Sequence, residues 1–314
     1  MKKKVKLPHF NTKERAGEKY PTSKSGDITI IAYTDSKNCT VQFEDGHIRE
    51  KVFFNSIKKG NISRNKNRVG EKYTTKEGYV IEIIEYLDSL NCTIKINDWN
   101  NTVLYNVRYS HVVVGNVKNP YHPSVINVGY FGIGDYKAVV NKVPTFAYKT
   151  WTALLKRNLC KIYQEKQPSY KDCSVDVAWH NFQVFGKWCE QNYNPKIMDG
   201  WQLDKDILVK GNKIYSPETC CFVPQEINTL FVSNNIRRGK FLIGVSKPKN
   251  SFIAHVNIRG VLTYLGSFKT EIEAFEAYRV SKEEYIKEVA DRWKGQITEQ
   301  VYQAMINYKV EIDD

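Results

Sequence analysis

The sequence predicts a multidomain α+β protein of 314 residues. Two small all-β barrel-like repeats come first, a mainly helical domain follows, and a three-stranded antiparallel sheet plus a helix ends the chain. Three observations predict this: a strand-rich segment that occurs twice, aromatic residues at helical spacing in the middle, and three strand-like runs before one long helical pattern. We expect domains at 1–68, 69–126, 127–236 and 237–314.

Two stretches of the first third align without a gap. Residues 17–41 read GEKYPTSKSGDITIIAYTDSKNCTV, and residues 70–94 read GEKYTTKEGYVIEIIEYLDSLNCTI. Each copy has the alternation of short strands, and Asp45-Gly46 is a strong hairpin signal. We therefore expect two copies of one small barrel. Such barrels serve as spacers, bind nucleic acid or dock a protein partner, and the sequence leaves these roles open.

Charge and cysteine usage narrow the class of protein. Lys plus Arg is 47 against 34 Asp plus Glu, a net charge of +13. This excess favours a polyanionic partner such as nucleic acid, although solubility alone is the simpler alternative.

Apolar runs are too short for a membrane span, and no apolar segment follows the basic start MKKKVKLPHF, so we expect no membrane partner and no secretory signal. The seven cysteines form no CxxC or zinc-finger spacing, which favours reduced thiols inside a cell.

The middle of the chain changes from strand to helix. Residues 116–135 contain Pro120, Pro123 and several glycines, which predicts a connector. Beyond it, two sets of apolar residues recur at helical spacing, and we expect both in the core rather than on a base-stacking surface. The sets are Tyr148, Trp151, Leu154 and Leu155, then Trp179, Phe182, Phe185 and Trp188.

Four motifs occur in order across residues 148–224: YKTWTALLKRNL, YKDCSV, WHNFQVFGKW and LDKDILVKGNKIYSPETCCFVP. As an ordered set they resemble a family of bacteriophage and prophage HNH-like endonucleases, within the His-Me finger or ββα-metal nuclease class. The resemblance implies a β-hairpin and helix that hold one divalent cation, with Mg²⁺ expected. The implied activity is hydrolysis of DNA phosphodiester bonds, as in homing endonucleases.

The family pattern carries over to this chain with two departures. Asp204 matches the metal-ligand position, but Lys205 stands where the general base is usual, and Thr219 stands where the family has an Asn ligand. Lysine is a poor base unless it is desolvated, but it can orient a phosphate. The base is then Asp206, His180, or a water activated by the metal without a protein base.

A simpler interpretation of the hairpin also stands. Asp204, Asp206 and Asn212 belong to residue types that commonly shape turns, so these three side chains can be purely structural. His180, taken alone, is more typical of a helix surface than of a catalyst.

The last third carries the clearest pattern. The strand-like runs FLIGVS, SFIAHVNI and VLTYLGSF precede TEIEAFEAYRVSKEEYIKEVADRW, which opens on a capping box of Thr270 and Glu273. The apolar stripe expected to pack on the sheet is Ile272, Phe275, Tyr278, Tyr285, Ile286, Val289 and Trp293.

Side chains of the middle strand alternate between its two faces. This alternation predicts that Ala254 and Val256 point toward the helix, and that His255, Asn257 and Arg259 point outward. A basic, polar sheet face of this kind can enter a major groove and contact base edges, with Lys247 and Lys249 on phosphates. The expected DNA contacts are Arg238, Lys240, Lys247, Lys249, His255, Asn257, Arg259 and Tyr264.

This module resembles the Apetala2/ethylene-response-factor (ERF), or integrase-type, DNA-binding domain. The matching residues are Gly244-Val245, Phe252-x-Ala254-x-Val256 and Leu265-Gly266-x-Phe268-x-Thr270-x-x-Glu273-Ala274-x-x-Ala277-Tyr278. The resemblance implies binding to double-stranded DNA. The outward positions carry less Arg and Trp than plant members do, so the target sequence stays open.

Two functions from different classes therefore remain. One is a phage-type, metal-dependent DNA endonuclease acting in the cytoplasm of a bacterial host. The alternative is a non-catalytic DNA-binding regulator or anti-defence protein with a degenerate nuclease hairpin. A third class, a structural or peptide-binding protein that uses the barrels, predicts no salt-dependent DNA affinity.

Overall fold

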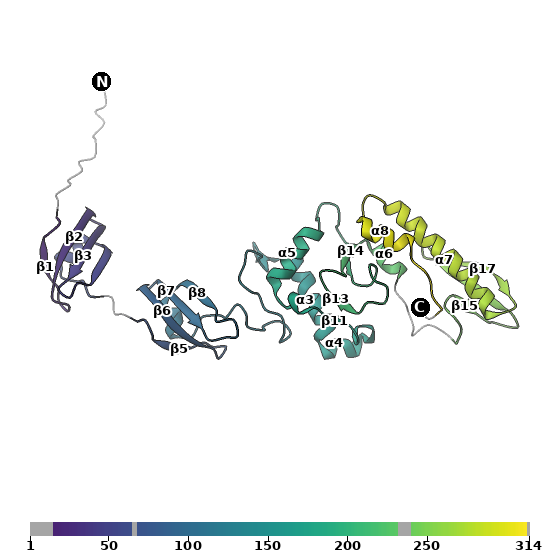
Figure 1. The fold of residues 1–314 in the computed structure, drawn as a ribbon, viewed down its shortest axis with the longest axis horizontal. Coiled ribbons are helices and arrows are strands. Elements are labelled where there is room, and N and C mark those ends of the chain that lie inside the picture. The colour runs from purple at the N-terminus through teal and green to yellow at the C-terminus, as the bar shows by residue number, and fades with distance from the viewer. Residues whose placement is uncertain (1–14, 65–67, 232–239, 313–314) are drawn as a thin grey trace, which may run out of the picture. The chain divides into compact units, whose positions relative to one another are not determined.

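The computed structural model of the chain describes residues 15–64, 68–231 and 240–312. These residues form several small antiparallel sheets and eight α-helices, so the predicted mixed α+β class is confirmed. The chain divides after Asn119 into two compact units (Figure 1). Arg238, one of the expected DNA contacts, lies outside the described residues, as does the predicted boundary at 236–237.

Each copy of the repeat in the first unit forms a four-stranded antiparallel meander followed by a short helix. The first copy contains β1 (Lys19–Pro21), β2 (Asp27–Asp35), β3 (Asn38–Phe43), β4 (Ile48–Val52) and α1 (Phe54–Lys58). The second contains β5 (Lys72–Thr74), β6 (Val80–Asp88), β7 (Asn91–Ile96), β8 (Val103–Val107) and α2 (Tyr109–Val113). Each copy has its own buried core, built from the alternating residues that predicted the strands.

The segment that opens the second unit is packed, which corrects part of the predicted connector. A Cβ added to Gly129 would lie 2.4 Å from Leu155 Cδ1 and 2.9 Å from Trp151 Cζ2. Tyr130 N donates to His180 O at 2.9 Å. The glycines are needed because the backbone runs directly against large side chains, so this stretch is part of the core and not only a linker.

The central elements enclose an aromatic core. They are β9 (Val139–Val140), β10 (Val143–Pro144), α3 (Phe146–Leu159), α4 (Lys161–Lys166), η1 (Pro168–Tyr170), β11 (Ser174–Val175), η2 (Val177–His180) and α5 (Phe182–Asn192). Trp151, Phe182 and Phe185 are fully buried, as the stripes predicted. Trp179 is buried too, but it lies on the 3-10 turn before α5 and not on the helix.

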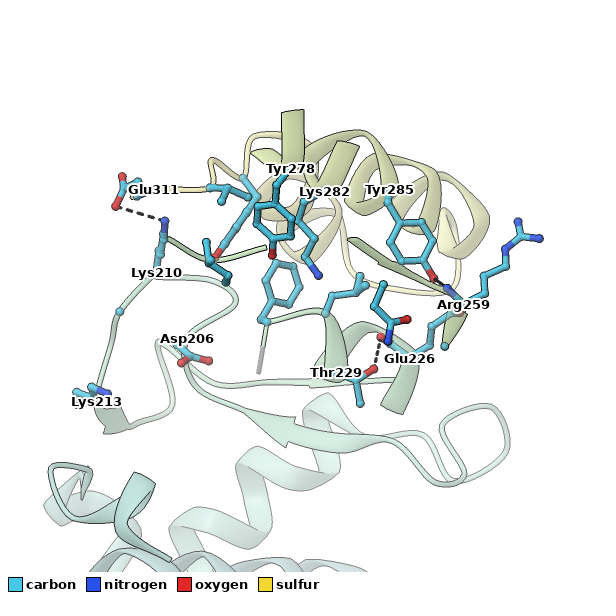
Figure 2. A pocket seen from close by; sticks show the side chains of 18 residues that line it. Asp206, Lys210, Lys213, Glu226, Thr229, Arg259, Tyr278, Lys282, Tyr285 and Glu311 are labelled. Carbon is cyan, nitrogen blue, oxygen red and sulfur yellow. Dashed lines mark hydrogen bonds and ion pairs between the residues drawn. The ribbon is translucent and has the colours of Figure 1, made fainter. Parts of the chain in front are cut away.

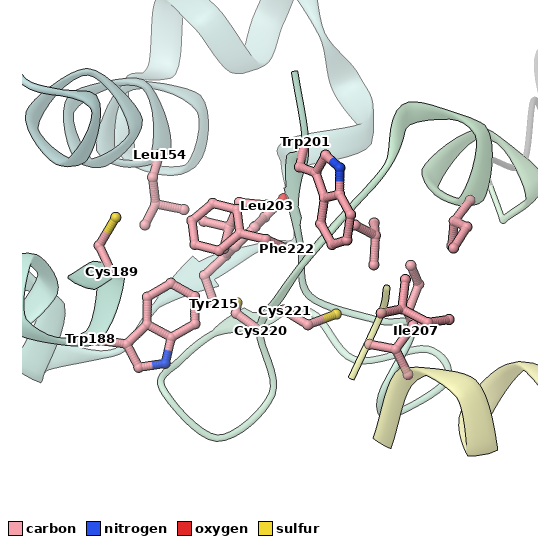
Figure 3. Close-up of a cluster of buried hydrophobic side chains, with 14 of the residues drawn as sticks. Leu154, Trp188, Cys189, Trp201, Leu203, Ile207, Tyr215, Cys220, Cys221 and Phe222 are labelled. Atoms are coloured by element: carbon pink, nitrogen blue, oxygen red, sulfur yellow. The ribbon is translucent and has the colours of Figure 1, made fainter. Parts of the chain in front are cut away.

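The remaining elements complete the second unit. They are β12 (Gln202–Asp204), β13 (Ile214–Tyr215), β14 (Cys221–Val223), α6 (Gln225–Leu230), β15 (Val245–Ser246), β16 (Phe252–Ile258), β17 (Val261–Phe268), α7 (Glu271–Trp293) and α8 (Glu299–Ile306). Figure 3 shows Trp201, Leu203, Ile207 and Phe222 in the buried cluster that also contains residues of α3, α5, α7 and α8. The hairpin and the end of the chain therefore share one core.

Helix α7 begins as predicted, because the capping box between Thr270 and Glu273 is complete. Ala274 and Phe275 are buried against the sheet, but Ile272 is 53% exposed, contrary to the predicted stripe. The buried contact starts at Ala274 and Phe275, so Ile272, in the first turn, precedes it.

Glu283 fixes the tail after α8 to the middle of α7. Its buried carboxylate accepts hydrogen bonds from Val310 N at 3.1 Å and Lys309 Nζ at 3.3 Å.

We predict that Glu283→Ala lowers the free energy of unfolding by about 1–3 kcal/mol, because Val310 N–H loses its acceptor. Urea unfolding measures this. Glu284→Ala, at an exposed neighbour, is the control and should change stability by less than about 0.5 kcal/mol.

The same carboxylate gives a pH dependence. Burial would raise the pKa of Glu283, but the hydrogen bonds from Val310 and Lys309 outweigh it, so its pKa lies below the ordinary 4.5. The unfolded chain then binds the proton more readily, so the stabilisation is present above pH 4.5 and is lost as the pH falls. We expect the stability difference between wild type and Glu283→Ala to shrink in acid. A difference that stays constant down to pH 3 would contradict this assignment.

Candidate functional site

The first candidate site is the hairpin at residues 202–223. Strand β12 pairs antiparallel with β14, and Asp204 lies opposite Cys221. The long loop between them contains β13, which pairs in parallel with β11. Helix α6 follows β14 after Pro224, so the order of elements is strand, loop, strand and helix.

Asp204 occupies the end of β12, and its carboxylate closes the turn that follows. Its Oδ1 accepts from Asp206 N and Ile207 N, both at 2.9 Å. Burial and the neighbouring Asp206 charge raise the pKa of Asp204 to about 6, although the two backbone donors oppose the shift. A carboxyl held this close to neutral pH is typical of functional sites, although structural networks also produce such shifts.

Lys205 is held in an ion pair and is not available as a base. Its Nζ lies 3.0 Å from Asp206 Oδ2, and its side chain is only 12% exposed. Burial would lower the pKa of Lys205, but the hydrogen bond and charge of Asp206 outweigh it, and the net shift is upward. Lys205 therefore stays an ammonium, which can neutralise or orient an anion but cannot accept a proton.

Asn212 and Thr219 hold the hairpin loop together. The Asn212 amide donates to Lys205 O and Ile214 O, both at 2.7 Å. The Thr219 hydroxyl donates to Ile214 O at 2.9 Å and lies 3.1 Å from Ser216 Oγ. These contacts match the structural interpretation of the loop residues, and they leave the Thr219 hydroxyl committed to its own turn.

His180 belongs to a different part of the site region. It ends the 3-10 turn η2, where its backbone carbonyl accepts from Tyr130 N. Burial lowers the pKa of His180, and Asp176 of its own turn is the charged neighbour that partly opposes this. No hydrogen bond or ion pair of the described chain joins His180 to Asp204. Within the described ranges, no group of three or more His, Cys, Asp or Glu side chains is arranged around a common point where a metal ion could bind.

The second candidate site is the outer face of the C-terminal sheet, of order β15-β16-β17. Ala254 and Val256 are buried on the helix side, as predicted. His255 faces Tyr264 across the strands, with ring centres 5.8 Å apart. Asn257 is exposed, and Tyr264 is 58% exposed. The structure thus brings His255, Asn257 and Tyr264 onto one open face.

Basic residues flank this sheet. Lys240, Lys247 and Lys249 are all exposed, and Lys247 Nζ lies 4.2 Å from the centre of the Phe252 ring. Lys249 lies in the loop between β15 and β16. All three lysines are therefore accessible to solvent.

Arg259 departs from the predicted outward face. It follows the end of β16 in the tight turn before β17, with a φ of 51°. Its guanidinium pairs with Glu288 of α7 at 2.6 Å, and its backbone N–H donates to Tyr285 Oη. The alternation of the strand stops at the turn, so the side chain points to the helix side.

Register also adds a residue that the sequence reasoning missed. Leu262 pairs with Asn257, which places it on the same outer face, and it is 68% exposed. A bulge at Ala254/His255 shifts β17 against β16, so the alternation of β17 alone does not predict which residues share the face with His255. The apolar side chain of Leu262 is of the kind that can contact the methyl group of a thymine base.

Comparison with known protein families, with curated proteins and with solved structures finds no match. Among the described residues, no helix has the length and apolar character needed to cross a membrane.

The two backbone donors at Asp204 predict different effects for two substitutions. Asp204→Ala should lower the free energy of unfolding by about 1–3 kcal/mol, because Asp206 and Ile207 lose a shared acceptor. Asp204→Asn keeps an acceptor oxygen at Oδ1 and removes a charge that burial disfavours, so it should be at least as stable as wild type. Urea unfolding at pH 7 compares the three proteins. Equal loss in both variants would show that the carboxylate charge itself holds the turn.

Proposed function

We propose that the protein binds double-stranded DNA in a sequence-directed way through its C-terminal sheet. The observation that carries the proposal is the outer face of β16 and β17, where His255 faces Tyr264 and the exposed Asn257 pairs with Leu262. Hydrogen-bonding side chains on a sheet face match base edges in a major groove about 12 Å wide. The resemblance to the Apetala2/ERF domain leads to the same proposal.

The lysines supply the part of binding that is independent of sequence. Lys240, Lys247 and Lys249 are exposed beside the sheet, and the whole chain carries a net charge of +13. Phosphate contacts by such residues position a protein on DNA and release counterions, so affinity falls as salt rises. Base contacts by Asn257 and His255 would then decide which sequence is preferred.

Two substitutions separate these roles. Asn257→Ala should weaken binding to the preferred site by about 1–3 kcal/mol and relax the preference at one base pair. Lys249→Ala should weaken binding to all sequences alike and reduce the salt slope by about one. Binding is measured by fluorescence anisotropy on a selected duplex and on random duplexes over a salt series. Lys287→Ala, on an exposed position of α7, is the control and should leave both quantities unchanged. Wild-type binding without salt dependence would contradict the proposal.

We further propose that the hairpin is the centre of a metal-dependent DNA endonuclease. The observation in favour is the half-buried Asp204 beside Asp206, with a raised pKa and with Lys205 adjacent. Two carboxylates are hard oxygen donors, and a divalent cation would relieve the repulsion between them. Asp204 and Asp206 therefore fit Mg²⁺. Thr219, the other predicted ligand, donates its hydroxyl proton to Ile214 O, so only its oxygen lone pairs would be available to the cation.

Each residue of the hairpin has a distinct role in this proposal. Mg²⁺, when bound, would stabilise negative charge on the scissile phosphate. Asp204 would hold it, and the Lys205 ammonium would orient the phosphate. Asp206 would both contribute a carboxylate and keep Lys205 in place. The alternative, a DNA-binding protein with an inactive hairpin, is favoured by the structural contacts of Asn212 and Thr219.

A plasmid-cleavage assay decides between an active endonuclease and a DNA-binding protein with an inactive hairpin. We expect wild type to nick or cut plasmid DNA with Mg²⁺ or Mn²⁺, and Asp204→Asn to lose at least about 100-fold in rate, as expected when a metal-holding group is removed. Asp204→Asn is the informative variant because it keeps the acceptor at the turn. Lys287→Ala, which should leave both the hairpin and the proposed DNA contacts intact, is the control. Wild type that binds DNA but cuts with neither metal would support the non-catalytic alternative.

A further inference from the structure

A cavity of about 960 Å³ lies between the hairpin and the C-terminal module (Figure 2). One wall comes from the hairpin loop, with Asp206, Lys210 and Lys213. The opposite wall comes from α7, with Tyr278, Lys282 and Tyr285, and the sides come from α6, the turn at Arg259 and the tail after α8. All of these elements belong to the second compact unit.

The acidic groups of the cavity wall are already neutralised. Asp206 pairs with Lys205 at 3.0 Å, and Glu311 pairs with Lys210 at 3.3 Å. Glu226 accepts from Arg292 at 2.6 Å and from Trp293 Nε1 at 2.8 Å. Each of these carboxylates therefore has a partner of its own in the described chain, and none of them pairs with Lys282.

Among the cations that line the cavity, Lys282 is half-buried and has no ion pair within the described chain, whereas Lys213 is exposed. Figure 2 shows the Lys282 side chain between Tyr278 and Tyr285, with the amine directed into the cavity. The side chain is half-buried, and burial lowers the pKa of its ammonium with no charged group of the described chain opposing that shift. Lysines with this degree of burial are normally paired, because removing an ammonium from water without a counter-charge is unfavourable.

The neighbourhood suits a group that carries negative charge on oxygen. Lys213 lines the same cavity from the hairpin side, and Arg259 lines it from the sheet side, although it also pairs with Glu288. The phenol groups of Tyr278 and Tyr285 lie beside the ammonium, where their apolar rings strengthen electrostatic attraction by excluding water. The volume exceeds that of a single phosphate ion, which leaves room for a phosphate still attached to its flanking sugars.

We propose that this cavity binds a backbone phosphate of DNA, with Lys282 as its principal counter-charge. The inference rests on the proposed DNA binding and extends it to a contact made by α7, in a cavity that Asn257 of the sheet also lines. Residues of the hairpin wall and of the α7 wall both line the space in which this phosphate would lie. A phosphate held there would fix the register between the strand segment at the hairpin and the base pairs under the sheet.

Substitution of Lys282 tests the proposal. Lys282→Met removes the charge and keeps the apolar stem, so it should fold at least as stably as wild type. The slope of log Kobs against log[salt] for duplex binding should fall by about 0.9, as expected for one lost phosphate contact. Lys282→Arg should keep the slope, and Lys287→Met, on the same helix but outside the cavity, should leave it unchanged.

The outcomes distinguish this inference from the wider proposal. Wild type without salt-dependent DNA binding would overturn the proposed function. Wild type that binds normally while Lys282→Met retains the full slope would overturn the cavity site alone. A second measurement identifies the source of the phosphate: inorganic phosphate should raise Tm of wild type, but not of Lys282→Met, over chloride at equal ionic strength. A phosphate-dependent Tm with an unchanged DNA slope would assign the site to a small phosphate compound and overturn the DNA contact.

Discussion

The buried contact between the second half of α7 and the hairpin is the constraint on which the rest of the second unit depends. Ile286 and Val289 of α7 belong to the same apolar cluster as Ile207 and Phe222 of the hairpin. Trp293 meets Trp201 edge to face, with ring centres 6.0 Å apart, and the carboxylate of Glu226 accepts from Trp293 Nε1. Because dispersion and burial act over the whole cluster, the hairpin cannot shift without disturbing the helix that also carries the sheet.

Helix α7 serves two cores along its length of about 34 Å. Its first half, with Phe275 and Tyr278, packs with Val256 of the sheet, and its second half, with Tyr285, enters the larger core. Lys282 lies between these halves, at the point where the helix passes from one core to the other. The cavity lies beside Lys282 at this transition, and residues of both walls line it.

The hairpin shows how the same groups can serve structure and chemistry. Asp204 closes a turn by accepting two backbone hydrogen bonds, and burial next to Asp206 makes its negative charge unfavourable. The ammonium of Lys205 balances the negative charge of Asp206, but it does not pair with Asp204 as well. Asp204 has no ion pair among the described residues, and the side chains of Asn212 and Thr219 donate hydrogen bonds within the loop.

The sequence by itself determined the local features of this protein. The repeat at 17–41 and 70–94, the Thr270–Glu273 capping box and the buried faces of α3 and β16 all follow from patterns within one segment, since periodicity and capping involve residues close in the chain. Only the tertiary structure decided what depends on residues far apart. Arg259 turned to Glu288, Gly129 proved to face Trp151, and Lys282 proved to lack a carboxylate partner among the described residues. Period-two and period-3.6 patterns state which face a residue occupies, but the charge or ring opposite it comes from another element, and packing alone selects that neighbour.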